Sequence, residues 1–119
     1  PGLPPVTFTP RRLIGDYVTV PANVAKVEAS YATDPTFYVG RGGAGGIDDR
    51  YAQVSEFLDR SIELGRPIEQ PRLSIGPGGV VVFGDGRHRW AVMRDRGYAT
   101  IPVSVRRAEA AEFKRRFGA

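Results

Sequence analysis

The amino-acid sequence predicts one small α+β domain in which helices flank a mixed sheet. Its 119 residues are 41% hydrophobic and 25% charged, which is ordinary for a globular domain with a single modest core. Short apolar runs typical of strands are mixed with segments of helical periodicity. The glycine-rich segment 76–79 lies between two of these runs, as the turn of a hairpin does.

Proline separates a lead-in from the domain. Four of the first ten residues are proline, which excludes a helix or a central strand there. We therefore expect residues 1–12 to form a linker or an extended lead-in and residues 13–119 to form the domain. In chain order the domain is expected to contain a strand at 17–20, a helix at 23–32, a strand at 36–39, a helix from Asp48 or Asp49 to Leu64, strands at 73–75 and 80–83, a helix at 87–96, a strand at 101–105 and a basic helix at 108–117.

The helices are predicted from apolar spacing and from their end residues. Val24, Val27 and Tyr31 recur at helical spacing in the first helix. In the second helix an aspartate suits the N-cap, and Gly65 suits the position just past the end. Gly97 stops the third helix in the same way. The apolar residues Trp90, Val92 and Met93 of this helix are expected in the core by default.

The strands are predicted from short apolar or β-branched runs. Pro21 is expected to end the strand at 17–20. The strand at 36–39 runs into the glycine-rich segment 40–46. Four consecutive apolar residues at 80–83 indicate a central strand of the sheet.

Composition excludes several classes of function. The chain has no cysteine and a single histidine, which excludes a disulfide scaffold, thiol catalysis and a metal site built from cysteines or several histidines. No apolar run approaches ~18 residues, so we expect no membrane partner. The chain begins with Pro1 and shows no signal peptide. This indicates a piece of a longer protein.

The positive charge is concentrated near the C-terminus. Residues 85–119 hold nine cations and four anions, whereas residues 1–84 hold eight and nine. Arginine supplies 15 of the 17 cations, and its planar guanidinium suits phosphate. The excess admits a nucleotide, a nucleic acid or an acidic protein as partner. The cations Lys114, Arg115 and Arg116 form either a solvated helix face or a nucleic-acid contact.

The segment Gly84–Arg89 has the composition of an anion site. An apolar strand is followed by Gly-Asp-Gly and then by the start of a helix, whose first N–H groups attract anions. Arg87, His88 and Arg89 add donors at the same place. Phosphate is therefore the expected ligand, and the alternative is a plain turn with solvated arginines.

The same region resembles the ParB/sulfiredoxin superfamily. The resemblance rests on Asp85-Gly86-Arg87-His88-Arg89, on Ala91, on Gly97 after the helix and on Ile101-Pro102-Val103. It covers about a third of the chain and implies a small α+β domain that binds a nucleotide on Gly84–Arg89. The superfamily includes CTP-hydrolysing partitioning proteins, ATP-using sulfiredoxins, a free-serine kinase and ParB-like nucleases.

The resemblance implies a role for each residue of the loop. Gly84 and Gly86 would give backbone donors and room, while Arg87 and Arg89 would bind phosphate oxygens. His88 would be a phosphate donor or a general acid or base, unless the backbone satisfies it. Asp85 would hold Mg²⁺, unless it caps the helix. Glu69 would be a base or metal partner, because related kinases use an acidic residue from another loop.

A second glycine-rich segment, residues 40–46, is expected to be either a lid over the ligand or a flexible surface loop. As a lid it would bring Arg41 or Arg50 to the phosphates. The cofactor expected at this site is Mg²⁺ with a nucleoside triphosphate, ATP or CTP.

Departures from the family leave three functions open. Arg87 stands where sulfiredoxins have their reactive cysteine, so sulfinic-acid reduction is excluded. The remaining candidates are phosphoryl transfer or hydrolysis, cleavage of DNA or RNA by a metal-dependent nuclease, and binding of a nucleotide or DNA without catalysis. Similar domains end phage proteins and polymorphic toxins. That context predicts an effector that acts in the cytoplasm, is delivered as the C-terminal domain of a larger secreted or phage protein and meets a cognate immunity or partner protein.

Overall fold

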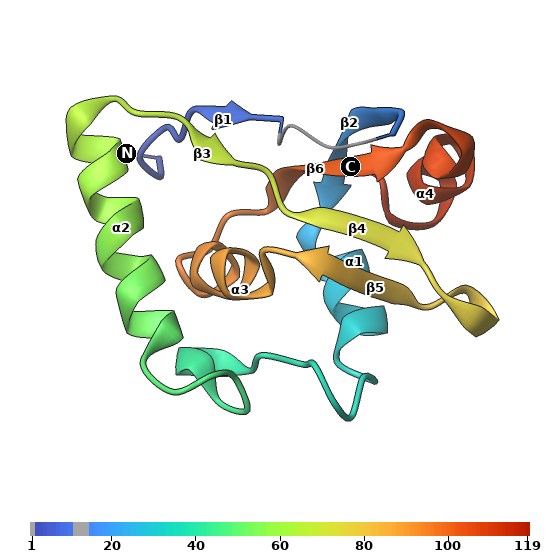
Figure 1. Cartoon of the computed structure of the whole chain (residues 1–119), viewed down its shortest axis with the longest axis horizontal. Helices are drawn as coiled ribbons and strands as arrows, with labels where there is room; N and C mark the ends of the chain where they lie inside the picture. The colour runs from blue at the N-terminus through green and yellow to red at the C-terminus, as the bar shows by residue number, and fades with distance from the viewer. Residues whose placement is uncertain (1, 11–14) are drawn as a thin grey trace.

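The computed structural model describes residues 2–10 and 15–119. It is an α+β domain, as the sequence predicts. Figure 1 shows α2 along one side of the molecule, with α3 between α2 and the strands. In chain order the elements are β1 (Phe8–Thr9), β2 (Tyr17–Asn23), α1 (Val24–Tyr31), the 3-10 turn η1 (Arg41–Gly43), α2 (Arg50–Leu64), β3 (Ile68–Glu69), β4 (Arg72–Ile75), the 3-10 turn η2 (Pro77–Gly79), β5 (Val81–Asp85), α3 (Arg87–Asp95), β6 (Thr100–Arg106), the 3-10 turn η3 (Arg107–Glu109) and α4 (Ala110–Phe117).

The described residues form a mixed four-stranded sheet in the order β2-β6-β4-β5. β2 pairs with β6 and β4 pairs with β5 in antiparallel fashion, and β4 and β6 run parallel. The short strand β1 pairs with β3 in parallel. Phe8 and Thr9 of the proline-rich lead-in are thus attached to the domain, while the expected boundary at residue 12 lies outside the described residues.

The prediction that Pro21 ends its strand is wrong. β2 continues through Pro21 to Asn23, and Pro21 lies opposite Pro102 of β6. β2 is an edge strand of the sheet that the described residues form. A proline is tolerated on such a strand because it need not donate to a second neighbour.

The prediction of a central strand at 80–83 is also wrong. β5 lies at the opposite edge of the sheet in the described part of the chain, and β4 and β6 take the central places. Its apolar side chains are explained by helices rather than by two neighbouring strands. The ring of Phe83 packs on Tyr31 of α1 and Trp90 of α3, with centroids 4.4 and 5.5 Å away.

The strand predicted at 36–39 is absent from the described structure, in which this segment is a turn followed by irregular backbone. The Oδ1 atom of Asp34 accepts hydrogen bonds from the N–H groups of Thr36 and Phe37, at 2.8 and 2.9 Å. The hydroxyl of Tyr31 donates to the Phe37 carbonyl at 2.6 Å. These side-chain bonds use the backbone groups that a strand would need.

The predicted helices are confirmed within a few residues at each end. Gly65 follows α2 in the left-handed conformation, as a C-cap glycine does. Asp49 occupies the N-cap position of α2, but its side chain makes no capping hydrogen bond and its φ is +61°. The second helix therefore begins without the side-chain cap that the sequence suggested.

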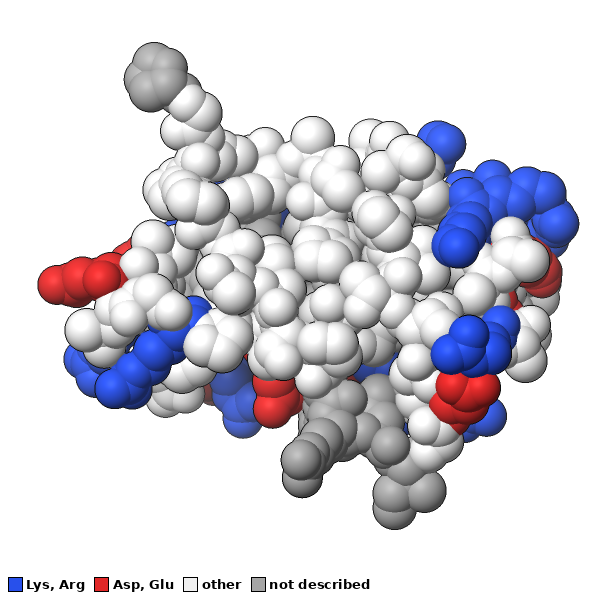
Figure 2. All heavy atoms as spheres, turned by 90° about the horizontal axis from the view of Figure 1, so that it is seen from above, with Lys and Arg blue, Asp and Glu red and all other residues white. Residues whose placement is uncertain are grey.

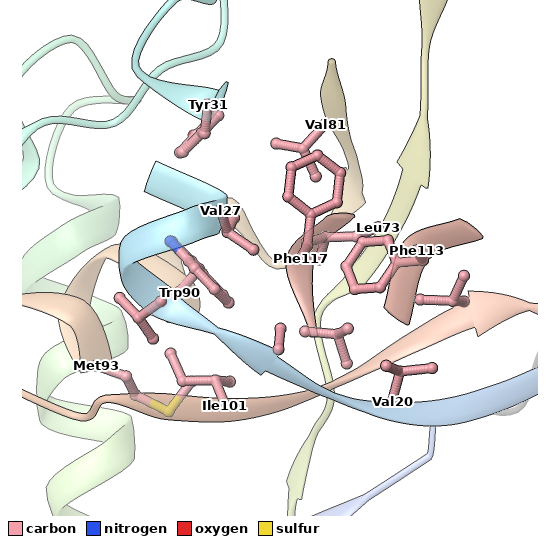
Figure 3. Packing of buried hydrophobic residues seen from close by; sticks show 14 of the residues in the cluster. Val20, Val27, Tyr31, Leu73, Val81, Trp90, Met93, Ile101, Phe113 and Phe117 are labelled. Carbon is pink, nitrogen blue, oxygen red and sulfur yellow. The ribbon is translucent and has the colours of Figure 1, made fainter. Parts of the chain in front are cut away.

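The core lies where α1, α3 and α4 pack against the sheet (Figure 3). Trp90 and Met93 of α3, Val27 of α1 and Phe113 of α4 are fully buried. The expectation that Trp90, Val92 and Met93 belong to the core is confirmed. Among the described residues no helix is long and apolar enough to cross a membrane.

Candidate functional site

A cavity of about 340 Å³ opens beside the loop between β5 and α3. One part of its wall is basic and is formed by the first residues of α2 and α3, and another part is apolar. Its size falls within the range of small-ligand sites. The lining residues are Phe37, Ile47, Arg50, Val54, Val82, Phe83, Gly84, Asp85, Gly86, Arg87, His88 and Arg89.

The N-terminus of α3 forms part of the basic wall. Gly86 is the N-cap with φ +81° and brings no capping side chain. The first turn of α3 contains no acidic residue, and Arg87, His88 and Arg89 follow in its place. The helix dipole and these side chains therefore favour an anion at the same point.

Two arginine side chains occupy the space beside the loop glycines. A Cβ on Gly84 would lie 2.7 Å from Arg72 Nε, and a Cβ on Gly86 would lie 2.7 Å from Arg89 Nη2. Arg72 also donates to the Gly84 carbonyl at 3.1 Å. The glycines thus make room for the protein's own guanidinium groups, which hold the loop in shape. Arg72 was not anticipated from the sequence.

Asp85 lies at the end of β5 and forms an ion pair with Arg89. The Nη2 and Oδ2 atoms are 3.0 Å apart, and the two side chains are 22% and 29% exposed for Arg89 and Asp85 respectively. Gly86 occupies the N-cap position of α3, so Asp85 lies one residue before the cap. The pair is partly open to solvent, so a phosphate and a cation can compete for its two members.

His88 is held by the residue that follows the second glycine-rich segment. The N–H of Ile47 donates to His88 Nε2 at 3.1 Å. Burial lowers the pKa of His88, and the charges of Arg87 and Arg50 lower it further. The lowered pKa favours the neutral ring, and the hydrogen bond from Ile47 places the proton of that form on Nδ1. This N–H can donate a hydrogen bond to a ligand.

The segment 40–46 is fastened to the helices that form the site. A carboxylate oxygen of Asp95 accepts from the Gly42 N–H at 2.9 Å and from the Tyr51 hydroxyl at 2.8 Å. A Cβ on Gly46 would lie 2.7 Å from His88 Nε2. Burial alone would raise the pKa of Asp95, but hydrogen bonds from Arg94, Gly42 and Tyr51 hold that pKa below its usual value. The segment is packed against α3 rather than free on the surface.

A polar network behind the cavity fixes α3 to α1. Glu28 accepts hydrogen bonds from Tyr38 Oη and Trp90 Nε1, both at 2.9 Å, and from Arg94 Nη1 at 3.1 Å. Arg94 also donates to the Val39 carbonyl at 2.6 Å. Neither Glu28 nor Arg94 was singled out from the sequence, because nothing in their spacing shows that they meet.

The cavity unites most of the residues predicted for the site. Arg50 lies on its wall, but Arg41 and Glu69 do not. Arg41 is exposed in η1, and Glu69 is exposed on β3. Sequence reasoning missed Phe37, Ile47, Val54 and Val82, which provide much of the apolar wall.

The side chains around the cavity could hold a Mg²⁺ ion if it arrives bound to a nucleotide. Within the described ranges, no three His, Asp or Glu side chains gather as a metal-binding group. A Mg²⁺ ion that arrives with a nucleotide needs only one or two carboxylates, because phosphate and water supply its other ligands. Asp85, the carboxylate on the cavity wall, fits that requirement.

The comparisons with known proteins bear on the fold. No family model matches the chain, and no curated protein sequence matches it. A search of solved structures finds the crystal structure of an oncogenic suppression activity protein, described as a plasmid fertility inhibition factor, in its gold(I) cyanide derivative. The TM-score is 0.64 at 17% sequence identity, over 88% of this chain and 58% of that chain.

The chain has a ParB/sulfiredoxin-like fold. The fold that the motif around Asp85-Gly86-Arg87-His88-Arg89 led us to expect is thus the fold of the domain. At this identity the likeness concerns the fold alone, and the domain spans 58% of the neighbour's chain. Any function of the domain has to be argued from its cavity.

Proposed function

We propose that this domain binds a nucleoside triphosphate such as ATP or CTP, with Mg²⁺, and transfers or hydrolyses its terminal phosphoryl group. The observation that carries the proposal is the division of one cavity into a basic wall and an apolar wall. Arg50, Arg87 and Arg89 line it together with the start of α3, and Phe37, Ile47 and Val54 line it elsewhere. A nucleotide has the same division into phosphates and base.

The basic wall would bind the phosphates. Arginine offers paired donors to phosphate oxygens, and the first turn of α3 adds backbone N–H groups. The Nδ1–H of the neutral His88 would be a further donor. A phosphate would bind beside Arg89, and the Asp85 carboxylate on the same wall would face the Mg²⁺ ion. A bound Mg²⁺ would neutralise charge that develops on the phosphoryl oxygens.

Thermal unfolding with ATP, GTP, CTP and UTP, each with and without Mg²⁺, tests the proposal. A nucleotide at about 100 times its Kd should stabilise the fold by about 2.7 kcal/mol and raise the Tm. Arg89→Ala should lose the shift. Arg60→Ala removes an equal charge from the exposed Arg60–Glu56 pair on α2 and should keep it.

Product analysis separates catalysis from binding. Release of inorganic phosphate or a labelled acceptor indicates the proposed reaction, whereas a shift without turnover indicates a binding module. If no nucleotide changes the Tm, the proposal is wrong. Degradation of plasmid DNA or RNA with metals then becomes the next assay, since the same basic wall suits a nucleic-acid backbone.

A further inference from the structure

Two phenylalanines line the cavity, and their rings differ in exposure and in packing. Phe83 packs against Tyr31 and Trp90, with ring centroids 4.4 and 5.5 Å away. Phe37 is 54% exposed although it lies on the cavity wall. An exposed aromatic ring on a cavity wall is available to stack on a ligand. Its place on the wall, rather than its exposure alone, distinguishes Phe37 from other exposed rings.

The turn that carries Phe37 is fixed from three sides. Asp34 accepts from its N–H at 2.9 Å, and its carbonyl accepts from Tyr31 Oη at 2.6 Å and from Arg87 Nη1 at 3.1 Å. These bonds use the backbone of Phe37, so they do not depend on its ring. The ring is thus presented by a rigid turn rather than by a loose loop.

Phe37 is also joined to the basic wall. The guanidinium carbon of Arg87 lies 5.3 Å from the ring centroid, within the range of a cation–π contact. One side chain therefore contacts the aromatic ring and belongs to the predicted phosphate-binding set. The second large apolar residue exposed on this wall is Ile47, at 52%. A ligand that matches both the exposed ring of Phe37 and the basic wall beside it has a flat aromatic part and an anionic part.

We infer that Phe37 is the stacking platform for the base of the bound nucleotide. The inference rests on the proposed function and adds a residue that contacts the base. Stacking on an aromatic side chain tolerates every base, because each base has a π-face. Phe37 should thus contribute affinity for nucleotides of every base rather than selectivity among them.

The test compares ATP with inorganic tripolyphosphate, which carries the phosphates without a base. Phe37→Ala should raise the Kd for ATP about tenfold or more and leave the Kd for tripolyphosphate unchanged. Phe57→Ala is the matched control, because Phe57 is also 54% exposed and lies on α2 outside the cavity lining. It should change neither Kd. Calorimetric titration measures all four changes.

A fluorescent variant gives a second readout. Trp90 is the single tryptophan and is fully buried. Phe37→Trp places an indole on the cavity wall, where a stacked base should quench its emission and tripolyphosphate should not. Phe57→Trp should show no quenching with either ligand.

The outcomes separate this inference from the proposed function. Equal weakening of ATP and tripolyphosphate by Phe37→Ala, or no weakening of ATP, overturns the platform and leaves the nucleotide site in place. Unquenched Phe37→Trp fluorescence in an ATP-saturated protein also overturns it. If the wild-type chain binds neither ligand, the nucleotide site and the platform both fall.

Discussion

The domain places cations at helix ends in two opposite ways. Lys114, Arg115 and Arg116 lie in the last turn of α4, where the negative end of the helix dipole stabilises them. Arg50 and Arg87 are the first residues of α2 and α3, where the positive end repels them. The two groups look alike in the sequence, yet their electrostatic effects on the unliganded fold have opposite signs.

Their surroundings differ as well. The cations of α4 are exposed. On the face of the molecule drawn in Figure 2, Lys and Arg side chains gather toward the two ends, one of which is the end where α4 lies. Arg50 and Arg87 border a concave cavity with Arg89. An unfavourable charge placement that recurs at two helix starts around one cavity supports the proposed anionic ligand, whereas the cations of α4 lie where the helix dipole stabilises them.

The largest expected effect is on nucleotide affinity. The double substitution Arg87→Gln and Arg89→Gln removes two charge-assisted contacts to phosphate, each worth about 1.5–3 kcal/mol, and should weaken ATP binding by about 100-fold or more. The same change at Lys114 and Arg115 should leave the Kd within about twofold. Calorimetry measures both, and equal losses in the two variants would show that only net charge matters.

A smaller effect on ATP binding is expected from the carboxylate that pairs with an arginine at the cavity, compared with the carboxylate that pairs with an arginine of α4. Asp85 pairs with Arg89 at 3.0 Å, and Glu112 pairs with Arg116 at 3.6 Å, each four residues apart. Asp85→Asn should strengthen metal-free ATP binding by roughly threefold to tenfold, because one competing anion is gone, and should abolish any gain from Mg²⁺. Glu112→Gln should change neither quantity in the same titrations. A Mg²⁺ gain that survives Asp85→Asn would contradict the assignment of Asp85 to the metal.

The two groups should also respond oppositely in the stability of the unliganded protein. Arg115→Gln removes a favourable interaction with the end of α4 and should lower the free energy of unfolding by about 0.3–1 kcal/mol. Arg50→Gln should raise it by a similar amount while weakening ATP binding. Urea unfolding at low salt measures both differences. A loss of stability in both variants would show that the position of the charge along the helix is unimportant.

The smallest expected effect is a pH dependence of the protein's stability that comes from His88 in the cavity wall. In the folded state the pKa of His88 lies below its ordinary value of 6.5, because of burial and of Arg87 and Arg50. The unfolded chain therefore binds more protons below about pH 6.5, and stability falls as the pH is lowered through this range. His88 is the single histidine, so His88→Gln should flatten the change in Tm between about pH 7.5 and about pH 5.5. An unchanged slope would exclude His88 as its source.

Local physics explains what could be predicted of the fold. Apolar spacing placed α1, α2 and α3 within a few residues, because helical hydrogen bonds join residues that are close in the chain. The strand predicted at 36–39 failed because Asp34 and Tyr31 take its backbone groups. The apolar run at 80–83 is explained by helix packing, which a single strand's sequence cannot distinguish from a central place in the sheet.

The residues of the candidate site also fall into those predicted from local sequence and those brought together by long-range packing. The residues from the apolar strand to the helix start are neighbours in the chain, so the amino-acid sequence was enough to predict a basic, glycine-containing loop there. Long-range packing brings Phe37, Ile47 and Arg50 to the same cavity as that loop and leaves Arg41 and Glu69 outside its lining. Phe37 and Arg87 are separated by 50 residues, and their contact depends on how α1 and α3 pack against the sheet. A local pattern records which groups a segment offers, while long-range packing selects which of them share a cavity.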